Sequence, residues 1–214
     1  LGRFRRVVIP NGVDSKVFFP IEKETAKLAL GIQPDQSIAL LCGFSGEPRK
    51  GLDQLTREIT QSNLPVERFL LLGQDDYSQW REDGWRTFSA TQDRKILRLI
   101  SSAADQTVFP SLQDNCPNTV LESMACGTPV LAFDGSGTAE IIESTEGGWL
   151  VPNKCFGDVI KRLETLLASP DELTAASRRC VPGIAKHYDY DHMLDQYIDL
   201  YSQLSNRAVL GGVN

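Results

Sequence analysis

The sequence has little of several features that mark particular classes of protein. Its 214 residues include only two histidines and no CxxC pair, so the ligand spacing of a zinc site is missing. No apolar run is long enough to cross a bilayer. The net charge of −6 argues against a nucleic-acid partner reached by bulk electrostatics. What remains is a globular chain, 41% hydrophobic and 23% charged, long enough to bury the core of one domain.

The five cysteines are odd in number and lie mostly among apolar residues. We therefore expect reduced, partly buried thiols, as is usual in cytoplasmic proteins. No signal peptide precedes them, and the chain starts at Leu1 rather than at a methionine. From this we expect a fragment of a longer cytoplasmic protein, with the inner face of the membrane as an alternative place for the full-length protein.

Apolar runs alternate with amphipathic stretches along most of the chain. The runs read as buried strands and the stretches as helices. This alternation predicts an α/β fold, a doubly wound parallel sheet with helices on both faces. The predicted strands are residues 37–42, 68–72, 85–88, 107–109, 129–133 and 148–151, and the predicted helices are 52–59, 94–103, 118–125, 138–143, 156–167, 171–187 and 190–204.

Polar and small residues follow four of the predicted strands, at residues 43–51, 73–76, 110–119 and 134–138. Ligands of open parallel sheets bind at the carboxyl ends of the strands, so these segments are candidates for one site. The alternative is that they are ordinary polar loops, which often follow strands. No GxGxxG follows any strand, and Leu52 and Asp53 stand where a phosphate-binding Walker loop requires lysine and serine or threonine.

The helix at 118–125 is the strongest single candidate. Asn115 or Cys116 suits its N-cap, Pro117 its first position, and Gly127 its stop. The amides of Asn118, Thr119 and Val120 are then free to bind an anion such as a diphosphate. The alternative is an ordinary capped helix whose start faces solvent.

Four charged residues lie in or near the segments that follow the predicted strands at 37–42 and 107–109. Arg49 and Lys50 begin another helical segment and are suited to clamp the same phosphates. Asp114 and Glu122 are eight residues apart and are suited to accept hydrogen bonds from sugar and ribose hydroxyls at either end of a diphosphate. The alternatives are a solvated turn for the cations, an Asx-turn for Asp114 and a surface carboxylate for Glu122.

Three motifs together resemble the family 4 glycosyltransferases, which are retaining enzymes of the GT-B fold. They are Ile-Pro-Asn-Gly-Val-Asp at residues 9–14, Glu-Pro-Arg-Lys-Gly at 47–51, and the block from Pro110 to Val130 that contains Asp114 and Glu122. The resemblance covers about Val7 to Leu204. It implies that residues 1–204 form the Rossmann-like C-terminal half, which binds the nucleotide-sugar donor, with a loose tail at 205–214 and the N-terminal acceptor domain absent from this chain.

The resemblance also implies a role for each candidate residue. Lys50, with Arg49, would bind the donor diphosphate, and the amides around Asn118, Thr119 and Val120 would hold its distal phosphate. Glu122 would take the ribose hydroxyls and Asp114 would touch the transferred sugar. The base pocket would be lined by Gly73, Phe88, Ser89 and Ala90.

The implied reaction transfers a hexose, with retention, from a UDP-, GDP- or ADP-linked sugar to an acceptor glycan or lipid-linked sugar, as in polysaccharide biosynthesis. No metal or other cofactor is expected, because cations and a helix dipole neutralise the leaving group. Two positions depart from the family pattern: Asp114 stands where glutamate is usual, and Phe44 where many relatives have arginine.

The alternative functions are a non-catalytic nucleotide-binding module, a sugar-nucleotide epimerase of the same fold, and a flavodoxin-like regulatory domain. Base, sugar, acceptor and oligomeric state leave no readable trace in the sequence.

Overall fold

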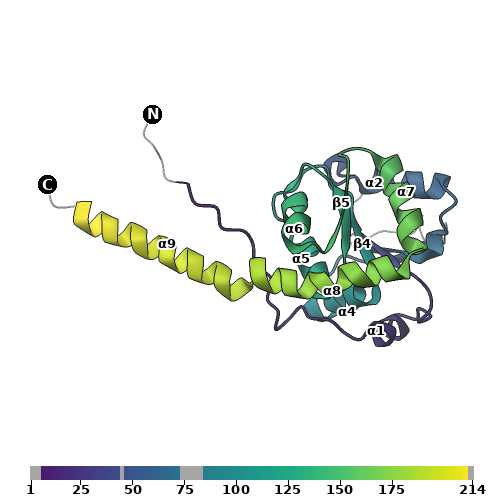
Figure 1. Ribbon diagram of the computed structural model, residues 1–214, viewed down its shortest axis with the longest axis horizontal. Helices are drawn as coiled ribbons and strands as arrows, with labels where there is room; N and C mark the ends of the chain where they lie inside the picture. Colours follow the sequence, from purple (N-terminus) through teal and green to yellow (C-terminus); the bar gives the residue numbers. More distant parts are fainter. Residues whose placement is uncertain (1–5, 44–45, 73–83, 212–214) are drawn as a thin grey trace.

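Residues 6–43, 46–72 and 84–211 are described in the computed structural model. Within them, six parallel strands form one sheet in the order β3-β2-β1-β4-β5-β6 (Figure 1). The predicted doubly wound α/β fold is therefore confirmed. The strands are β1 (Ala39–Cys42), β2 (Phe69–Leu72), β3 (Arg86–Phe88), β4 (Gln106–Phe109), β5 (Val130–Phe133) and β6 (Gly148–Val151).

Helices link and cover the strands. They are α1 (Lys23–Ala29), α2 (Leu52–Gln61), α4 (Arg94–Ala103), α5 (Asn118–Ala125), α6 (Gly137–Thr145), α7 (Phe156–Leu167), α8 (Pro170–His187) and α9 (Tyr190–Gly211), with two short 3-10 turns, η1 (Pro48–Lys50) and η2 (Val66–Arg68). The bounds of α4, α5, α7 and β6 are those predicted from the sequence. Helix α1 was not predicted from the sequence.

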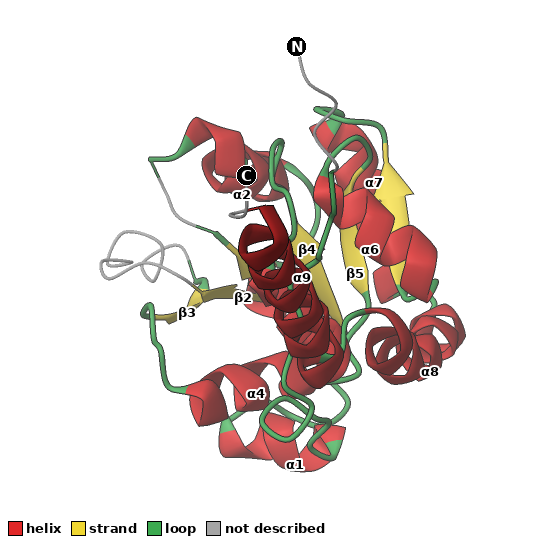
Figure 2. Ribbon diagram, turned by 90° about the vertical axis from the view of Figure 1, so that its left-hand side faces the viewer, coloured by secondary structure: helices red, strands yellow, loops and turns green. Residues whose placement is uncertain are grey.

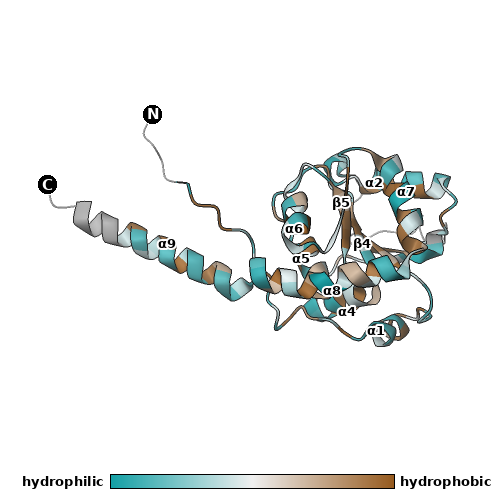
Figure 3. Ribbon diagram, in the orientation of Figure 1, coloured by the Kyte–Doolittle hydropathy of each residue, from teal (hydrophilic) through white to brown (hydrophobic). Residues whose placement is uncertain are grey.

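Side chains alternate between the two faces of the sheet. On β1, Ala39 and Leu41 join the core formed with α2 and α7, whereas Leu40 and Cys42 join the core formed with Ile100 of α4. Figure 2 shows α2 and α7 on one side of the strands and α4 on the other, and the hydrophobic colouring of Figure 3 runs through the central strands. Since both faces are covered, the strands are apolar throughout.

Helix α9 projects away from the sheet layers, beside the segment that leads in from the N-terminus (Figure 1). It extends to Gly211, so the loose tail expected from residue 205 is helical as far as Gly211. The reason is that residues 205–210 contain no proline or glycine to end the helix. Several of its apolar side chains are exposed, Ile198 and Tyr201 among them. Among the described residues, no helix has the length and hydropathy needed to cross a membrane.

Candidate functional site

The candidate site lies where the sheet reverses its direction of winding. β1 and β4 are neighbours, and the chain continues from β1 toward β2 and from β4 toward β5, on opposite sides of that pair. The two connections therefore part at the carboxyl ends of β1 and β4 and leave a crevice there. Lys50 follows β1, and Asp114 and Glu122 follow β4. The topology alone brings these three predicted residues to one place.

Backbone contacts join the two loops. After η1, Gly51 takes a left-handed conformation with φ of 68°, and a Cβ there would lie 2.2 Å from the carbonyl oxygen of Pro110. The amide of Leu112 donates to the carbonyl of Arg49 over 2.8 Å. Only glycine combines this φ with so close an approach. These contacts fix Lys50 against the end of β4.

Lys50 and Asp114 form an ion pair with each other. Lys50 Nζ lies 2.8 Å from Asp114 Oδ2, and the two side chains are only 19% and 18% exposed. The same Nζ lies 5.9 Å from the ring centroid of Phe109. Partial burial strengthens such a pair compared with one at an exposed surface. Two residues that the sequence assigned to different parts of one ligand are thus in direct contact.

The start of α5 differs from the prediction in one respect. Pro117 is the N-cap, not the first helical residue, and no side chain caps the helix. Cys116 lies outside the helix, as is usual for a residue before proline, and its carbonyl accepts a hydrogen bond from Asn11 Nδ2 at 2.9 Å. The helix stop is as predicted, with Gly127 at φ of 81° just after the C-cap.

This shift changes which backbone amides are free. The amide of Val120, expected to be free, donates to the carbonyl of Pro117 over 3.1 Å. The amides of Asn118 and Thr119 have no acceptor among the described residues. Two free amides at the end of the helix dipole remain an anion-binding arrangement.

Next to these amides is a cavity of about 190 Å³. Lys50, Thr119 and Glu122 line it, together with Ala90 from the segment after β3. Four predicted site residues therefore meet in one hollow between the strand ends, α4 and α5. The sequence analysis missed other lining residues, including Cys42, Leu97, Ser101 and Phe109, because small or apolar residues inside regular elements carry no polar signal.

Burial changes the protonation of two groups in this cavity. Desolvation raises the pKa of the Glu122 carboxyl above its usual value, and the charge of Arg94 opposes this only in part. Burial likewise raises the pKa of the Cys42 thiol to about 12, so that thiol stays protonated at neutral pH. No donor among the described residues bonds the Glu122 carboxylate, which leaves it available to hydroxyl groups of a ligand.

Two of the predicted base-pocket residues do not join Ala90 at the cavity. Phe88 packs against the core on the α4 side of the sheet, and Ser89 is exposed. Gly73 lies outside the described residues, as does Phe44. Neither Phe88 nor Ser89 lines the cavity.

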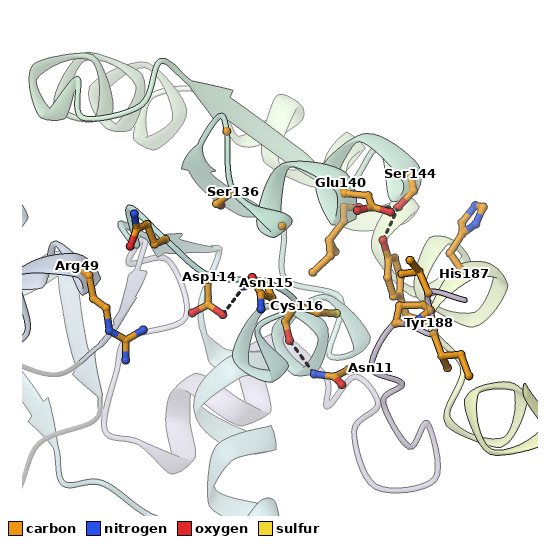
Figure 4. Close-up of a pocket in the computed structure, with 17 residues that line it drawn as sticks. Asn11, Arg49, Asp114, Asn115, Cys116, Ser136, Glu140, Ser144, His187 and Tyr188 are labelled. Carbon is orange, nitrogen blue, oxygen red and sulfur yellow. Dashed lines mark hydrogen bonds between the residues drawn. The ribbon is translucent and has the colours of Figure 1, made fainter. Parts of the chain in front are cut away.

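A wide groove of about 1390 Å³ lies on the other side of the ion pair. Asp114, Arg49 and Asn11 line it, and residues from α6 and the end of α8 form its far wall (Figure 4). Arg49 Nη2 is 3.0 Å from Glu47 Oε2, in an exposed ion pair. Arg49 thus faces the groove, whereas Lys50 faces the cavity, so the two cations do not converge on one point.

Metal-binding side chains do not cluster in this region. The described part of the chain contains no group of three or more His, Cys, Asp or Glu side chains that could hold a metal ion. The polar groups at the site include one amine, two carboxylates, two free amides and the hydroxyls that line the cavity.

Known proteins provide three comparisons. The family model described as glycosyl transferases group 1 matches residues 36–169. A D-inositol 3-phosphate glycosyltransferase of Mycolicibacterium smegmatis is 28% identical over 94% of this chain and 48% of its own length. The sucrose-phosphate synthase of Thermosynechococcus elongatus superposes with a TM-score of 0.80 at 24% identity, covering 93% of this chain and 52% of that one.

A further solved structure is the HepE protein of Anabaena in complex with UDP, with a TM-score of 0.76 at 17% identity over 92% of this chain and 57% of that one. These structural likenesses establish the fold. The chain spans about half the length of the curated relatives it matches, 47% of one from Rhodococcus erythropolis. Since the family model covers most of the chain, this protein belongs to the group 1 glycosyltransferase family.

Proposed function

We propose that this chain is the nucleotide-sugar-binding domain of a retaining glycosyltransferase. The parent enzyme transfers a hexose from a nucleoside diphosphate sugar to an acceptor glycan or glycolipid. One observation carries the proposal: Lys50, Asp114, Glu122 and the start of α5 converge at the switch point of the sheet. Membership of the family supports the reaction class.

The diphosphate binds between Lys50 and the start of α5. The free amides of Asn118 and Thr119 lie at the positive end of the α5 dipole, and Thr119 lines the same cavity as Lys50. A phosphate oxygen that reaches Lys50 competes with Asp114 for its ammonium group. In the reaction these groups stabilise the charge that develops on the leaving diphosphate.

The ion pair divides the donor into two parts. Lys50 lines the cavity and Asp114 lines the groove, so a donor bound across the pair places its nucleoside in the cavity and its sugar in the groove. Glu122 then accepts hydrogen bonds from the ribose hydroxyls, and Asp114 contacts the transferred hexose. The open groove is the side from which an acceptor approaches.

The donor base is proposed to be uracil, ahead of guanine and adenine. Two crystal structures of the HepE protein of Anabaena contain UDP or UDP-glucose and superpose on this chain with TM-scores of 0.76 and 0.74.

Calorimetric titration of the 214-residue chain with UDP, GDP and ADP tests the proposal. We expect UDP to bind, and Lys50→Ala and Glu122→Ala each to weaken binding by about 1.5–3 kcal/mol, the value of a lost charge-assisted hydrogen bond. Lys161→Ala is the matched control, because Lys161 is exposed on α7 and pairs only with Asp158 of its own helix among the described residues. Absence of binding by all three nucleotides at millimolar concentration would contradict the proposal.

The alternative of a non-catalytic nucleotide-binding module is distinguished from the proposed function by an assay of sugar transfer. A full-length parent that binds UDP but transfers no sugar would favour that reading, since in this structure Asp114 is engaged by Lys50.

A further inference from the structure

The hydroxyl of Ser101 is a polar group on the wall of the small cavity, without a protein partner in the described part of the chain. Ser101 is 6% exposed and lines the cavity of about 190 Å³. Its Oγ has no hydrogen-bond partner among the described residues. Buried hydroxyls are normally bonded, so an open hydroxyl that faces a cavity marks a place where a ligand can supply the partner.

Several other buried hydroxyls of the described residues are bonded. The exceptions are Thr138 of α6, which lies outside this cavity, and the half-buried Thr119, which lines it. Ser102 Oγ accepts a hydrogen bond from the amide of Ile21 at 3.1 Å. Ser123 Oγ lies 2.5 Å from Thr107 Oγ1. Thr145, in α6, bonds back to the carbonyl of Ile141, one turn earlier, at 2.7 Å, which is the usual way for a helical hydroxyl to be satisfied. Ser101 makes no such bond within α4.

Ser101 lines the cavity one turn after Leu97 on α4. Helix α4 begins just after the loop at Ala90 and Thr91, which borders the same cavity, and packs beside α5, which carries Glu122. The remaining wall near Ser101 is apolar, with Leu97 and Cys42 among its members. Besides Lys50, the polar side chains that line the cavity are the Glu122 carboxylate and the hydroxyls of Ser101, Thr119 and Thr91. The Thr91 hydroxyl already accepts a hydrogen bond from the amide of Asp93.

The Glu122 carboxylate and the Ser101 hydroxyl are complementary to a hydroxyl of the ligand. A carboxylate only accepts hydrogen bonds, whereas a serine hydroxyl also donates one. A ribose hydroxyl can donate its proton to Glu122 and accept the proton of Ser101 at the same time. The pyrimidine ring has no single atom that both donates and accepts in this way.

We propose that Ser101 donates a hydrogen bond to the ribose hydroxyl of the donor whose own proton goes to Glu122. Ser101 is then a specificity-determining residue that favours ribonucleotides over their deoxy analogues. This inference rests on the proposed donor-binding function.

Titration calorimetry with UDP, 2′-deoxy-UDP and 3′-deoxy-UDP tests the inference on the unmodified chain and on Ser101→Ala. We expect the substitution to weaken UDP binding about threefold to tenfold, as for the loss of one neutral hydrogen bond. The loss should vanish with one of the two deoxy analogues, because that analogue lacks the hydroxyl that Ser101 contacts. Alanine is the best helix former, so α4 should be preserved.

Ser102→Ala is the matched control, since Ser102 is the adjacent buried serine and lies outside the cavity. It should leave the affinity for UDP unchanged. Equal weakening of all three ligands by Ser101→Ala would overturn the ribose assignment. If Glu122→Ala weakens UDP binding but Ser101→Ala does not, this inference fails while the proposed function stands, whereas no binding of UDP to the unmodified chain counts against both.

Discussion

At the scale of single residues, the site keeps Glu122 where its charge is costly to the fold. Burial raises the pKa of its carboxyl, so between the unfolded and folded pKa values the folded chain holds more protons than the unfolded chain. The free energy of unfolding therefore falls as pH rises through that window. Below the window the carboxyl is protonated in both states and its burial as a charge costs nothing. Ionising this carboxyl in the folded chain therefore costs stability, as expected for a group kept for binding.

We predict that Glu122→Gln stabilises the chain more at pH 7 than at pH 4, compared with the unmodified chain at each pH. The difference in melting temperature between the variant and the unmodified chain should grow by about 1–3 °C over this range, because only the carboxyl becomes charged. Thermal unfolding followed by circular dichroism measures it. Glu143→Gln, at an exposed position on α6, is the control, and a pH-independent difference at Glu122 would contradict the prediction.

The sequence identified the charged members of the site but not their pairing. Lys50, Asp114 and Glu122 were predicted because they follow strands in a parallel sheet, and the structure brings Lys50 and Asp114 into contact. Ser101 and Cys42 were missed because a small residue within a helix or strand looks the same whether it faces core or cavity. The separation of Arg49 from Lys50 depends on the turn of η1, which the sequence does not reveal.

At the scale of elements, the junction of η1 with the end of β4 depends on Gly51. We predict that Gly51→Ala lowers the free energy of unfolding through two effects, the strain of a left-handed alanine and a clash of its Cβ. The clash should add about 1–3 kcal/mol, because the Cβ would lie 2.2 Å from the Pro110 carbonyl oxygen. The substitution should also weaken UDP binding, since Lys50 precedes Gly51 directly. Urea denaturation and calorimetry measure the two effects.

Gly31→Ala provides a matched control for that substitution. Gly31 has the same φ of 68°, but a Cβ there would meet nothing within 4 Å. The free energy of unfolding of Gly31→Ala should therefore fall by only about 1–2 kcal/mol, the strain of a left-handed alanine. UDP binding should be retained. Equal losses for the two variants would show that the contact with Pro110 contributes nothing.

Most elements could be predicted from apolar periodicity, and the failures have physical causes. α1 has no clear apolar stripe: its buried Lys27 is held by Asp105, with Nζ 2.9 Å from Oδ2. Only the tertiary structure supplies that partner. The short α1 is also capped by the side chain of Glu22, an unusual N-cap residue. The extension of α9 to Gly211 was missed because its last residues lack periodicity.

At the scale of the whole molecule, the chain spans about half the length of its curated relatives. Glycosyl transfer requires the donor and the acceptor to be held in line, and the groove beside Asp114 is open. We predict that the 214-residue chain binds UDP and does not transfer sugar. Incubation with UDP-glucose and a candidate acceptor, followed by mass spectrometry, checks this, and turnover of a defined acceptor would contradict it.

The ion pair at the switch point joins residues 64 positions apart in the chain. The described elements between them are α2, η2, β2, β3, α4 and β4. Contacts of such high sequence separation tend to form slowly. A nucleotide that needs both strand ends recognises only the finished domain and shifts the folding equilibrium toward it by mass action. The cellular pool of donor would thus act as a stabiliser of newly made copies as well as a source of sugar.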